Sequence, residues 1–145
     1  MEIKVKRLFP EAKLPTYGSD SAVGADLYAA ELEGVEIAPG ETVLIHTGIA
    51  LEIPEGYGGF LYARSGLATK KGLAPANKVG VIDPDYRGEV MVALYNQSSE
   101  TRLVEPGERI AQLVIAPFIR GEFSLAEELG ETARGAGGFG STGVR

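Results

Sequence analysis

The sequence predicts an all-β protein, a jelly-roll-like β barrel or sandwich with one short helix and a flexible Gly-rich C-terminal arm. Apolar residues recur with period two in short runs, and 20 glycines and 8 prolines interrupt these runs. The 3.6-residue periodicity of amphipathic helices is almost absent. Many short strands at turn-like spacing are typical of sandwiches and jelly rolls.

Four strands are expected in the first half of the chain. Residues 3–8 and 25–28 alternate apolar and polar side chains, as half-buried strands do. Residues 42–53 predict one long strand, or two, with a break near His46-Thr47-Gly48. Residues 57–63 are rich in aromatic side chains and follow a Pro-Glu-Gly turn.

The second half of the chain predicts further strands over residues 89–95 and 110–119. Two nearly identical turn signals, Pro39-Gly40-Glu41 and Pro106-Gly107-Glu108, each precede a β-type run. Proline followed by glycine favours a tight turn, so we expect the same strand–turn–strand unit at both places.

Helix is expected at one place, Ser65–Lys71, with Ser65 as the N-cap residue. Residues Leu125–Leu129 are a weaker candidate for one further helical turn. The whole chain, residues 1–145, is expected to form a single domain. Within it we expect a β core over about residues 1–129 and a mobile arm over about residues 130–145, which has too little apolar surface to fold alone.

Composition restricts the classes of function. The formal net charge is −6 and the pI about 4.9, which disfavours nucleic-acid binding because nucleic-acid binders present a basic face. Cysteine is absent, so disulfides, thiolate metal sites and thiol nucleophiles are excluded. No apolar run is long enough to span a membrane, and no signal-peptide core is seen at the N-terminus. We therefore expect a cytoplasmic protein that binds neither nucleic acid nor membranes.

Two short segments carry groups that suit a phosphate ligand. In Gly24–Tyr28, Asp26 lies on an alternating strand, where a carboxylate usually faces solvent. In Ala63–Ala68, Arg64 and Ser65 open the expected helix, which suits either an anion site or a plain N-cap. Either segment alone is compatible with an ordinary structural role.

Two other segments place polar residues where packing does not explain them. Residues 77–88 predict an apolar strand, a tight turn and a returning strand, and Asn77, Asp83 and Tyr86 crowd this one ribbon. An ordinary hairpin explains Pro84 and Gly88 but not that crowding. In residues 107–112 Gln112 interrupts an otherwise apolar strand.

The glycine-rich C-terminus also has two interpretations. Gly-rich ends are commonly frayed. However, consecutive glycines let backbone N–H groups converge on an anion, and Phe139 is the only aromatic residue among them. Arg134 before the glycines, and Ser141-Thr142 after them, add groups that can bind phosphate.

Taken together and in this order, the five segments resemble the five motifs of the trimeric dUTPase family. The matching residues are Gly24-Ala25-Asp26-Leu27, Arg64-Ser65-Gly66, Gly80-Val81-Ile82-Asp83 with Tyr86-Arg87-Gly88, Gly107-Glu108-Arg109-Ile110-Ala111-Gln112, and Arg134-Gly135 through Gly143. The resemblance extends from about Ala22 to Gly143. It implies hydrolysis of dUTP to dUMP and pyrophosphate, serving dUMP biosynthesis and excluding uracil from DNA.

The resemblance also implies catalytic roles. Asp83 is expected to be the general base for the water that attacks the α-phosphorus. Arg64, Ser65 and the amide of Gly66 are expected to contact the phosphates. Asp26 and Gln112 are expected to act through waters around Mg²⁺, with the ion held mainly by the substrate phosphates.

For the nucleoside, the resemblance implies recognition by the ribbon from Asn77 to Met91. Its backbone and the Asn77 amide complement the hydrogen-bonding edge of uracil, and cytosine would leave buried partners unpaired. Tyr86 would lie against the deoxyribose and leave no room for a 2′-hydroxyl. The residues expected to bind the base and sugar are Asn77, Gly80, Val81, Ile82, Asp83, Tyr86 and Met91.

The resemblance implies a homotrimer with active sites shared between subunits. One chain would supply Asp26, Arg64 and Gln112, a second the ribbon, and a third the arm. In the arm, Arg134 would reach the γ-phosphate, Phe139 would cover the uracil ring, and Gly140, Ser141 and Thr142 would close over the phosphates.

Two other functions remain possible at this point. A dCTP deaminase on a related fold typically has a second serine where this chain has Gly66. A trimer without activity, used as a scaffold, would lack the base or the arm arginine, whereas this chain has Asp83 and Arg134. His46, the only histidine, is expected to be structural because no second ligand residue accompanies it.

Overall fold

The structure is a computed structural model that describes residues 1–139, and it confirms the all-β prediction. Its elements, in chain order, are β1 (Lys4–Arg7), β2 (Thr16–Tyr17), β3 (Ala25–Tyr28), β4 (Val35–Ile37), β5 (Thr42–Glu52), β6 (Tyr57–Tyr62), the short helix η1 (Leu67–Lys71), β7 (Leu73–Pro75), β8 (Gly80–Ile82), β9 (Glu89–Asn96), β10 (Arg102–Val104) and β11 (Arg109–Pro117). The long strands β5, β6, β9 and β11 lie where runs of β-prone residues predict them. The short strands β2, β4, β7 and β10 were not predicted, because a segment of two or three residues is too short to show a periodic pattern.

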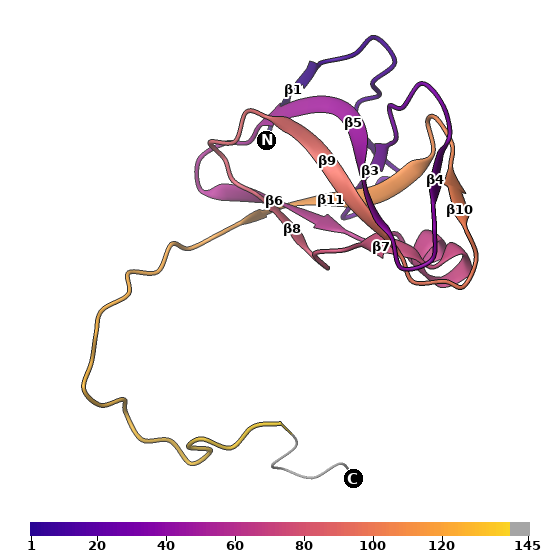
Figure 1. The fold of residues 1–145 in the computed structure, drawn as a ribbon. Helices are drawn as coiled ribbons and strands as arrows, with labels where there is room; N and C mark the ends of the chain where they lie inside the picture. The colour runs from indigo at the N-terminus through magenta and orange to yellow at the C-terminus, as the bar shows by residue number, and fades with distance from the viewer. Residues whose placement is uncertain (140–145) are drawn as a thin grey trace.

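The strands form three antiparallel sheets (Figure 1). One sheet has the order β1-β5-β9-β7, the second has the order β2-β3-β11-β6-β8, and the third pairs β10 with β4. Neighbours in each sheet are mostly distant in sequence, as in jelly-roll topologies. The chain therefore brings segments from all parts of the sequence onto common sheets.

The core lies inside these sheets. β9 shows how the sequence places it, since buried residues alternate with more exposed ones along the whole strand. Each fully buried leucine or isoleucine stabilises the fold by about 1.5–3 kcal/mol through removal of apolar surface from water. The largest completely buried apolar side chains are Leu27, Ile37, Ile45, Ile49, Leu73, Leu94, Ile110, Val92 and Val104.

The break predicted near residues 46–48 of β5 is confirmed as a β-bulge. The register with β9 shifts between His46 and Ala50. Gly48 has φ of +67°, and a Cβ atom built there would lie 2.7 Å from the Cβ of Ala12 and 2.9 Å from the Phe9 ring. Only glycine fits this position without displacing its neighbours.

The two Pro-Gly-Glu signals form the same turn. In residues 38–41 and 105–108 the N–H of the fourth residue donates to the carbonyl of the first, at 3.0 Å in both turns. Gly40 and Gly107 have φ of +77° and +75°, which glycine adopts without strain. The glutamate that ends each turn also accepts a hydrogen bond from the first N–H of its turn, at 2.8 and 3.1 Å.

The predicted helix is present, but the prediction that Ser65 is its N-cap is wrong. Ser65 and Gly66 already have helical backbone, η1 follows them, and the N-cap, Gly66, makes no side-chain capping hydrogen bond. Instead, the Thr69 hydroxyl donates to the Ser65 carbonyl at 2.7 Å. The helix packs on the core through buried Leu67 and ends at Gly72 in the left-handed conformation.

The last strand ends at Pro117, before the boundary near residue 129 that the sequence predicted. Residues 118–139 contain neither helix nor strand, so the helical turn expected over Leu125–Leu129 is wrong. Both leucines are almost fully exposed, and without a surface to pack against, one short turn does not repay its nucleation cost. Figure 1 shows this segment extending away from the strands. No helix among the described residues is long and apolar enough to cross a membrane.

Candidate functional site

Asp26 lies between two arginine side chains. Arg64 Nε donates to its Oδ1 at 2.7 Å, and an Nη of Arg109 donates to its Oδ2 at 3.1 Å. Arg64 also donates to the Arg109 carbonyl at 3.3 Å. One carboxylate thus orients two guanidinium groups and leaves the group as a whole with one net positive charge, which suits an anionic ligand.

Gln112 lies directly beside this cluster. It is paired in register with Asp26 on β3 and with Tyr62 on β6. Its Nε2 donates to the Ala63 carbonyl at 2.8 Å, which fixes the amide at the point where the chain leaves β6. A Cβ at Gly24 would lie 2.5 Å from Gln112 Oε1, so this glycine is needed for the amide to keep its place.

Ser65 and Gly66 follow Arg64 at the exposed start of the helical segment. A Cβ at Gly66 would meet no atom within 4 Å, so open space lies in front of this backbone. The structure therefore brings Asp26, Arg64, Ser65, Gly66 and Gln112 to one end of the five-stranded sheet. We call these residues, with Arg109, the arginine cluster.

A second group of predicted residues surrounds a cavity of about 240 Å³ beside β8 and β9. We call it the nucleoside cavity. It contains every residue between 77 and 91 that the sequence predicted to bind the base and sugar. Its lining residues are Leu61, Asn77, Gly80, Val81, Ile82, Asp83, Tyr86, Glu89, Val90 and Met91.

The loop after β8 shapes one wall of the nucleoside cavity. The N–H of Tyr86 donates to the Asp83 carbonyl at 3.1 Å, and the Tyr86 hydroxyl donates to the Glu89 carbonyl at 3.0 Å. A Cβ at Gly88 would lie 2.3 Å from the Tyr86 hydroxyl oxygen. The ring therefore occupies a space that exists only because residue 88 has no side chain.

The arginine cluster and Asp83 lie far apart within one chain. Asp26 of β3 and Tyr62 of β6 are both paired in register with Gln112 of β11, which lies between them. On the other side of β6, Ile82 of β8 is paired with Gly59. Asp83 is thus separated from Asp26 by three strand spacings across the sheet and by about four residues along the strands. Together these give about 20 Å between the two residues. A single bound triphosphate with its α-phosphorus beside Asp83 does not reach the arginine cluster of the same chain.

The described part of the arm reaches neither group. Arg134 is exposed, and its Nε donates to the Gly137 carbonyl at 2.7 Å. Phe139 is fully exposed, with φ of +49°. The predicted residues Gly140, Ser141 and Thr142 lie outside the described residues.

The sequence assigned no role to two residues that the structure places at these sites. Arg109 binds the carboxylate oxygen of Asp26 that Arg64 leaves free, and its place three residues before Gln112 on β11 was the available signal. Glu89 lines the nucleoside cavity at the start of β9, and nothing local distinguishes it from a solvent-facing glutamate.

No group of three or more His, Asp or Glu side chains able to hold a metal ion occurs within residues 1–139. A metal ion at the arginine cluster would find one carboxylate, Asp26, already bound to two guanidinium groups. This donor set fits Mg²⁺ carried mainly by ligand phosphates and its own waters, with Asp26 contacting those waters.

Comparison with known proteins gives three concordant findings. A family model described as dUTPase matches residues 10–143. The deoxyuridine 5'-triphosphate nucleotidohydrolase of Desulfitobacterium hafniense is 57% identical over 133 residues, which cover 91% of this chain and 88% of the relative. The dUTPase of Staphylococcus bacteriophage 80alpha, solved with dUpNHpp, superposes with a TM-score of 0.86 at 33% identity, covering 99% of both chains.

A further solved relative is a variant dUTPase from phage phi11 of S. aureus, described for its coordination of a structural Mg(II) ion. It superposes with a TM-score of 0.78 at 28% identity and covers 88% of this chain and 98% of its own. The sequence motifs, the fold and these relatives agree, and the chain belongs to the dUTPase family, the enzymes that hydrolyse dUTP to dUMP.

Proposed function

We propose that this chain hydrolyses dUTP by attack of a water, activated by Asp83, at the α-phosphorus, and that Mg²⁺ assists the release of pyrophosphate. The observation that carries the proposal is the nucleoside cavity, which places Asp83 at the edge of a space lined by the predicted base- and sugar-binding residues. The phage 80alpha relative, solved with the dUTP analogue dUpNHpp, supports dUTP as the occupant.

Two aspartates have different surroundings, and this difference supports different roles. Asp26 accepts from Arg64 on one oxygen and from Arg109 on the other, so each oxygen is already paired with a guanidinium group. Asp83 is exposed, and no ion pair joins it to another residue among those the structure describes. An exposed, unpaired carboxylate at the cavity edge can accept a proton from water, whereas Asp26 serves to orient arginines.

Base selection follows from the cavity wall. β8 presents its backbone between Gly80 and Ile82, and strand amides and carbonyls can pair with the hydrogen-bonding edge of uracil. A site of this type rejects a ligand with mismatched donors by about 10⁴-fold, because buried partners stay unpaired. Thymine has the same edge, so its 5-methyl group must be excluded by the closeness of the wall.

Sugar selection falls to Tyr86. Its hydroxyl is held by the Glu89 carbonyl, so the ring cannot move freely away from the cavity. The fixed ring would lie against the deoxyribose and clash with a 2′-hydroxyl. This predicts preference for dUTP over UTP.

The arginine cluster would bind the phosphates. Arg64 supplies charge, the Ser65 hydroxyl and the Gly66 amide supply donors, and Gln112 faces the same space. Mg²⁺, when bound, would neutralise phosphate charge. The phi11 relative, described with a structural Mg(II) ion, supports only that a member of the family binds this metal.

The site would be completed by other copies of the chain, in a homotrimer. Two features support this. The nucleoside cavity and the arginine cluster are about 20 Å apart within one chain. The segment after β11 also leaves large apolar side chains almost wholly exposed, which an isolated chain has no means of burying. These are Ile119, Phe123, Leu125, Leu129 and Phe139.

The test is pyrophosphate release from dUTP, dCTP, dTTP and UTP, each with and without Mg²⁺. The proposal expects release from dUTP alone and strong dependence on the metal. Equal release from all four nucleotides would show that the nucleoside cavity does not select the base. Release of ammonia from dCTP would instead identify a deaminase.

A further inference from the structure

The bulge in β5 holds the start of β9 through three hydrogen bonds. His46 Nδ1 lies 2.8 Å from Glu89 Oε2, and the N–H of Gly48 donates to Glu89 Oε1 at 2.8 Å. The buried Thr47 hydroxyl donates to the Val90 carbonyl. Both oxygens of the Glu89 carboxylate are thus occupied, and its side chain is only 14% exposed.

The same segment of β9 also borders the nucleoside cavity. Glu89 and the two residues that follow it line the cavity, and the Glu89 carbonyl accepts the hydrogen bond from the Tyr86 hydroxyl. Glu89 therefore connects His46, which lies outside the cavity, to the tyrosine ring inside it.

We propose that His46 is a positioning residue for the nucleoside cavity. Its Nδ1–H donates to Glu89 and so holds the start of β9 in the position from which the Glu89 carbonyl fixes Tyr86 against the sugar. The charge on the imidazole strengthens this hydrogen bond, and nucleotide affinity therefore depends on pH. This inference rests on the proposed function, because it takes the cavity beside β8 and β9 as the nucleoside site.

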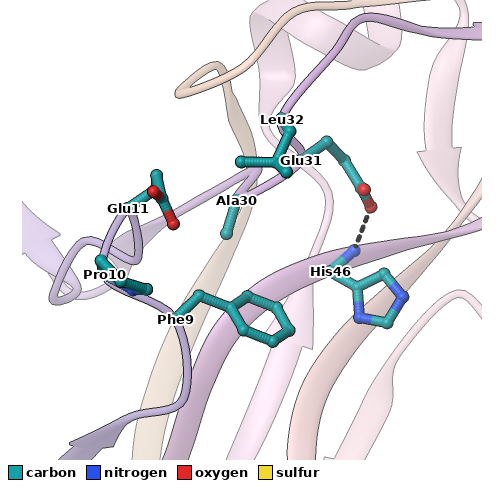
Figure 2. A pocket seen from close by; sticks show the side chains of 7 residues that line it. All are labelled: Phe9, Pro10, Glu11, Ala30, Glu31, Leu32 and His46. Atoms are coloured by element: carbon teal, nitrogen blue, oxygen red, sulfur yellow. Dashed lines mark hydrogen bonds between the residues drawn. The ribbon is translucent and has the colours of Figure 1, made fainter.

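His46 can exchange protons with solvent. It borders a hollow of about 290 Å³ whose other walls come from the segments after β1 and β3 (Figure 2). Its side chain is 44% exposed, and the Phe9 ring lies 6.1 Å from its own ring, centroid to centroid. The imidazole is therefore fixed on one side by Glu89 and accessible on the other.

Within residues 1–139, the charged groups that act on His46 or line the hollow beside it are carboxylates. Glu89 comes from β9, Glu31 from the segment after β3, and Glu11 from the segment after β1. Glu31 also accepts the backbone N–H of His46 at 2.9 Å, which Figure 2 shows as a dashed line. The hydrogen bond to Glu89 raises the pKa of His46 above its ordinary value of 6.5, although partial burial opposes this, and the charges of Glu89 and Glu31 add to the increase.

The direction of the pH effect follows from this raised pKa. Below the pKa the imidazolium donates a charge-assisted hydrogen bond to the carboxylate, and above it the neutral ring donates a weaker one. The charge-assisted part of this contribution is complete below pH 6.5 and is lost as the pH rises through the raised pKa. Nucleotide affinity should decrease over the same range.

The experiment compares wild type, His46→Ala and His46→Asn, with Lys4→Ala as the control. In His46→Asn the side-chain amide supplies a donor in place of Nδ1–H but does not titrate, and Lys4 forms an exposed ion pair with Glu52 at the other side of β5. The measurements are kcat and KM for dUTP and the inhibition constant of dUMP, taken for each protein at a series of pH values. Each variant's value is divided by the wild-type value at the same pH, so that the titration of the nucleotide itself cancels.

At low pH, His46→Ala should raise KM and the dUMP inhibition constant about fivefold and leave kcat within about twofold. The change is smaller than the full strength of a charge-assisted hydrogen bond because His46 is partly exposed and acts on the cavity only through Glu89. At high pH the ratio should fall to the smaller value expected for loss of a neutral hydrogen bond. His46→Asn should match wild type at high pH and remove the pH dependence. Lys4→Ala should give a ratio near one throughout.

Two results would overturn the inference. One is a ratio for His46→Ala that does not change with pH, and the other is failure of His46→Asn to recover affinity. A wild type that hydrolyses dUTP but is not inhibited by dUMP would instead count against the nucleoside cavity. Failure of the His46 inference and failure of the proposed nucleoside site therefore give different results.

Discussion

Arg64 and Asp26 lie 38 residues apart in the sequence, yet Arg64 Nε and Asp26 Oδ1 are 2.7 Å apart in the fold. The carboxylate is 13% exposed and the arginine side chain 25%, so water competes weakly for this contact. Arg109 binds the other carboxylate oxygen at 3.1 Å. The pair fixes a guanidinium group at the end of β6, where the expected phosphate-binding residues begin.

Asp26→Asn should impair phosphate binding more than folding. The amide cannot accept from both guanidinium groups as a carboxylate does, so Arg64 loses its fixed orientation. We expect kcat/KM for dUTP to decrease about 10²-fold and stability to fall by about 1–3 kcal/mol. Steady-state kinetics and urea unfolding measure the two effects. Glu52→Gln, which weakens an exposed pair with Lys4, is the control, and an equal kinetic loss there would contradict the assignment.

Asp83→Asn should nearly abolish turnover and keep nucleotide binding, because asparagine cannot accept the proton from the attacking water. A decrease in kcat of about 10²–10⁴-fold is expected, with little change in dUMP affinity. Asp85→Asn is a matched control on the same loop, since Asp85 lines the neighbouring hollow beside Glu55 and Arg87 but not the nucleoside cavity, whereas Asp83 lines both. Turnover near the wild-type rate in Asp83→Asn would refute the base assignment.

Gly88→Ala should reduce discrimination between dUTP and UTP. The new methyl group would overlap the Tyr86 hydroxyl, which lies 2.3 Å from its position, so the ring must swing away from the sugar. Because the ring is already 44% exposed, the fold should tolerate this movement. The ratio of kcat/KM for dUTP to that for UTP should fall about tenfold. Gly18→Ala, where the methyl group meets no atom within 4 Å, should leave the ratio unchanged.

Asn96→Ala should destabilise the fold without altering the site. Asn96 is completely buried, and its amide donates at 2.8 Å to the carbonyls of both Ile37 and Glu100. Its carbonyl oxygen accepts from the N–H and hydroxyl of Ser98. Loss of these partners should cost about 2–4 kcal/mol in urea unfolding. Gln97→Ala, at the neighbouring exposed position, should cost far less.

Two truncations should separate the functions of the C-terminal segment. Ending the chain after Ala133 removes Arg134 and Phe139, and it should abolish most activity while assembly persists. Ending it after Phe118 also removes apolar residues that are almost fully exposed here, and it should weaken assembly as well. Light scattering and pyrophosphate release measure the two effects. Dissociation caused by the shorter deletion would contradict this division.

Local pattern was sufficient to predict much of this protein. Period-two alternation identifies β3 because one face of this strand lies in the core, and runs of β-prone apolar residues identify β5, β9 and β11. Proline and glycine identify the two matching turns because their backbone angles are restricted or unusual in any context. Five motifs in order identified the family because each consists of neighbouring residues.

Only the tertiary structure decided which of these residues meet. Strand pairing joins Asp26 to Arg64 and Arg109, and the β5 bulge joins His46 to Glu89, across 38, 83 and 43 residues. No local period encodes such contacts, because they depend on sheet order and register. For the same reason His46 appeared in the sequence as an isolated structural residue, and in the fold it reaches the wall of the nucleoside cavity.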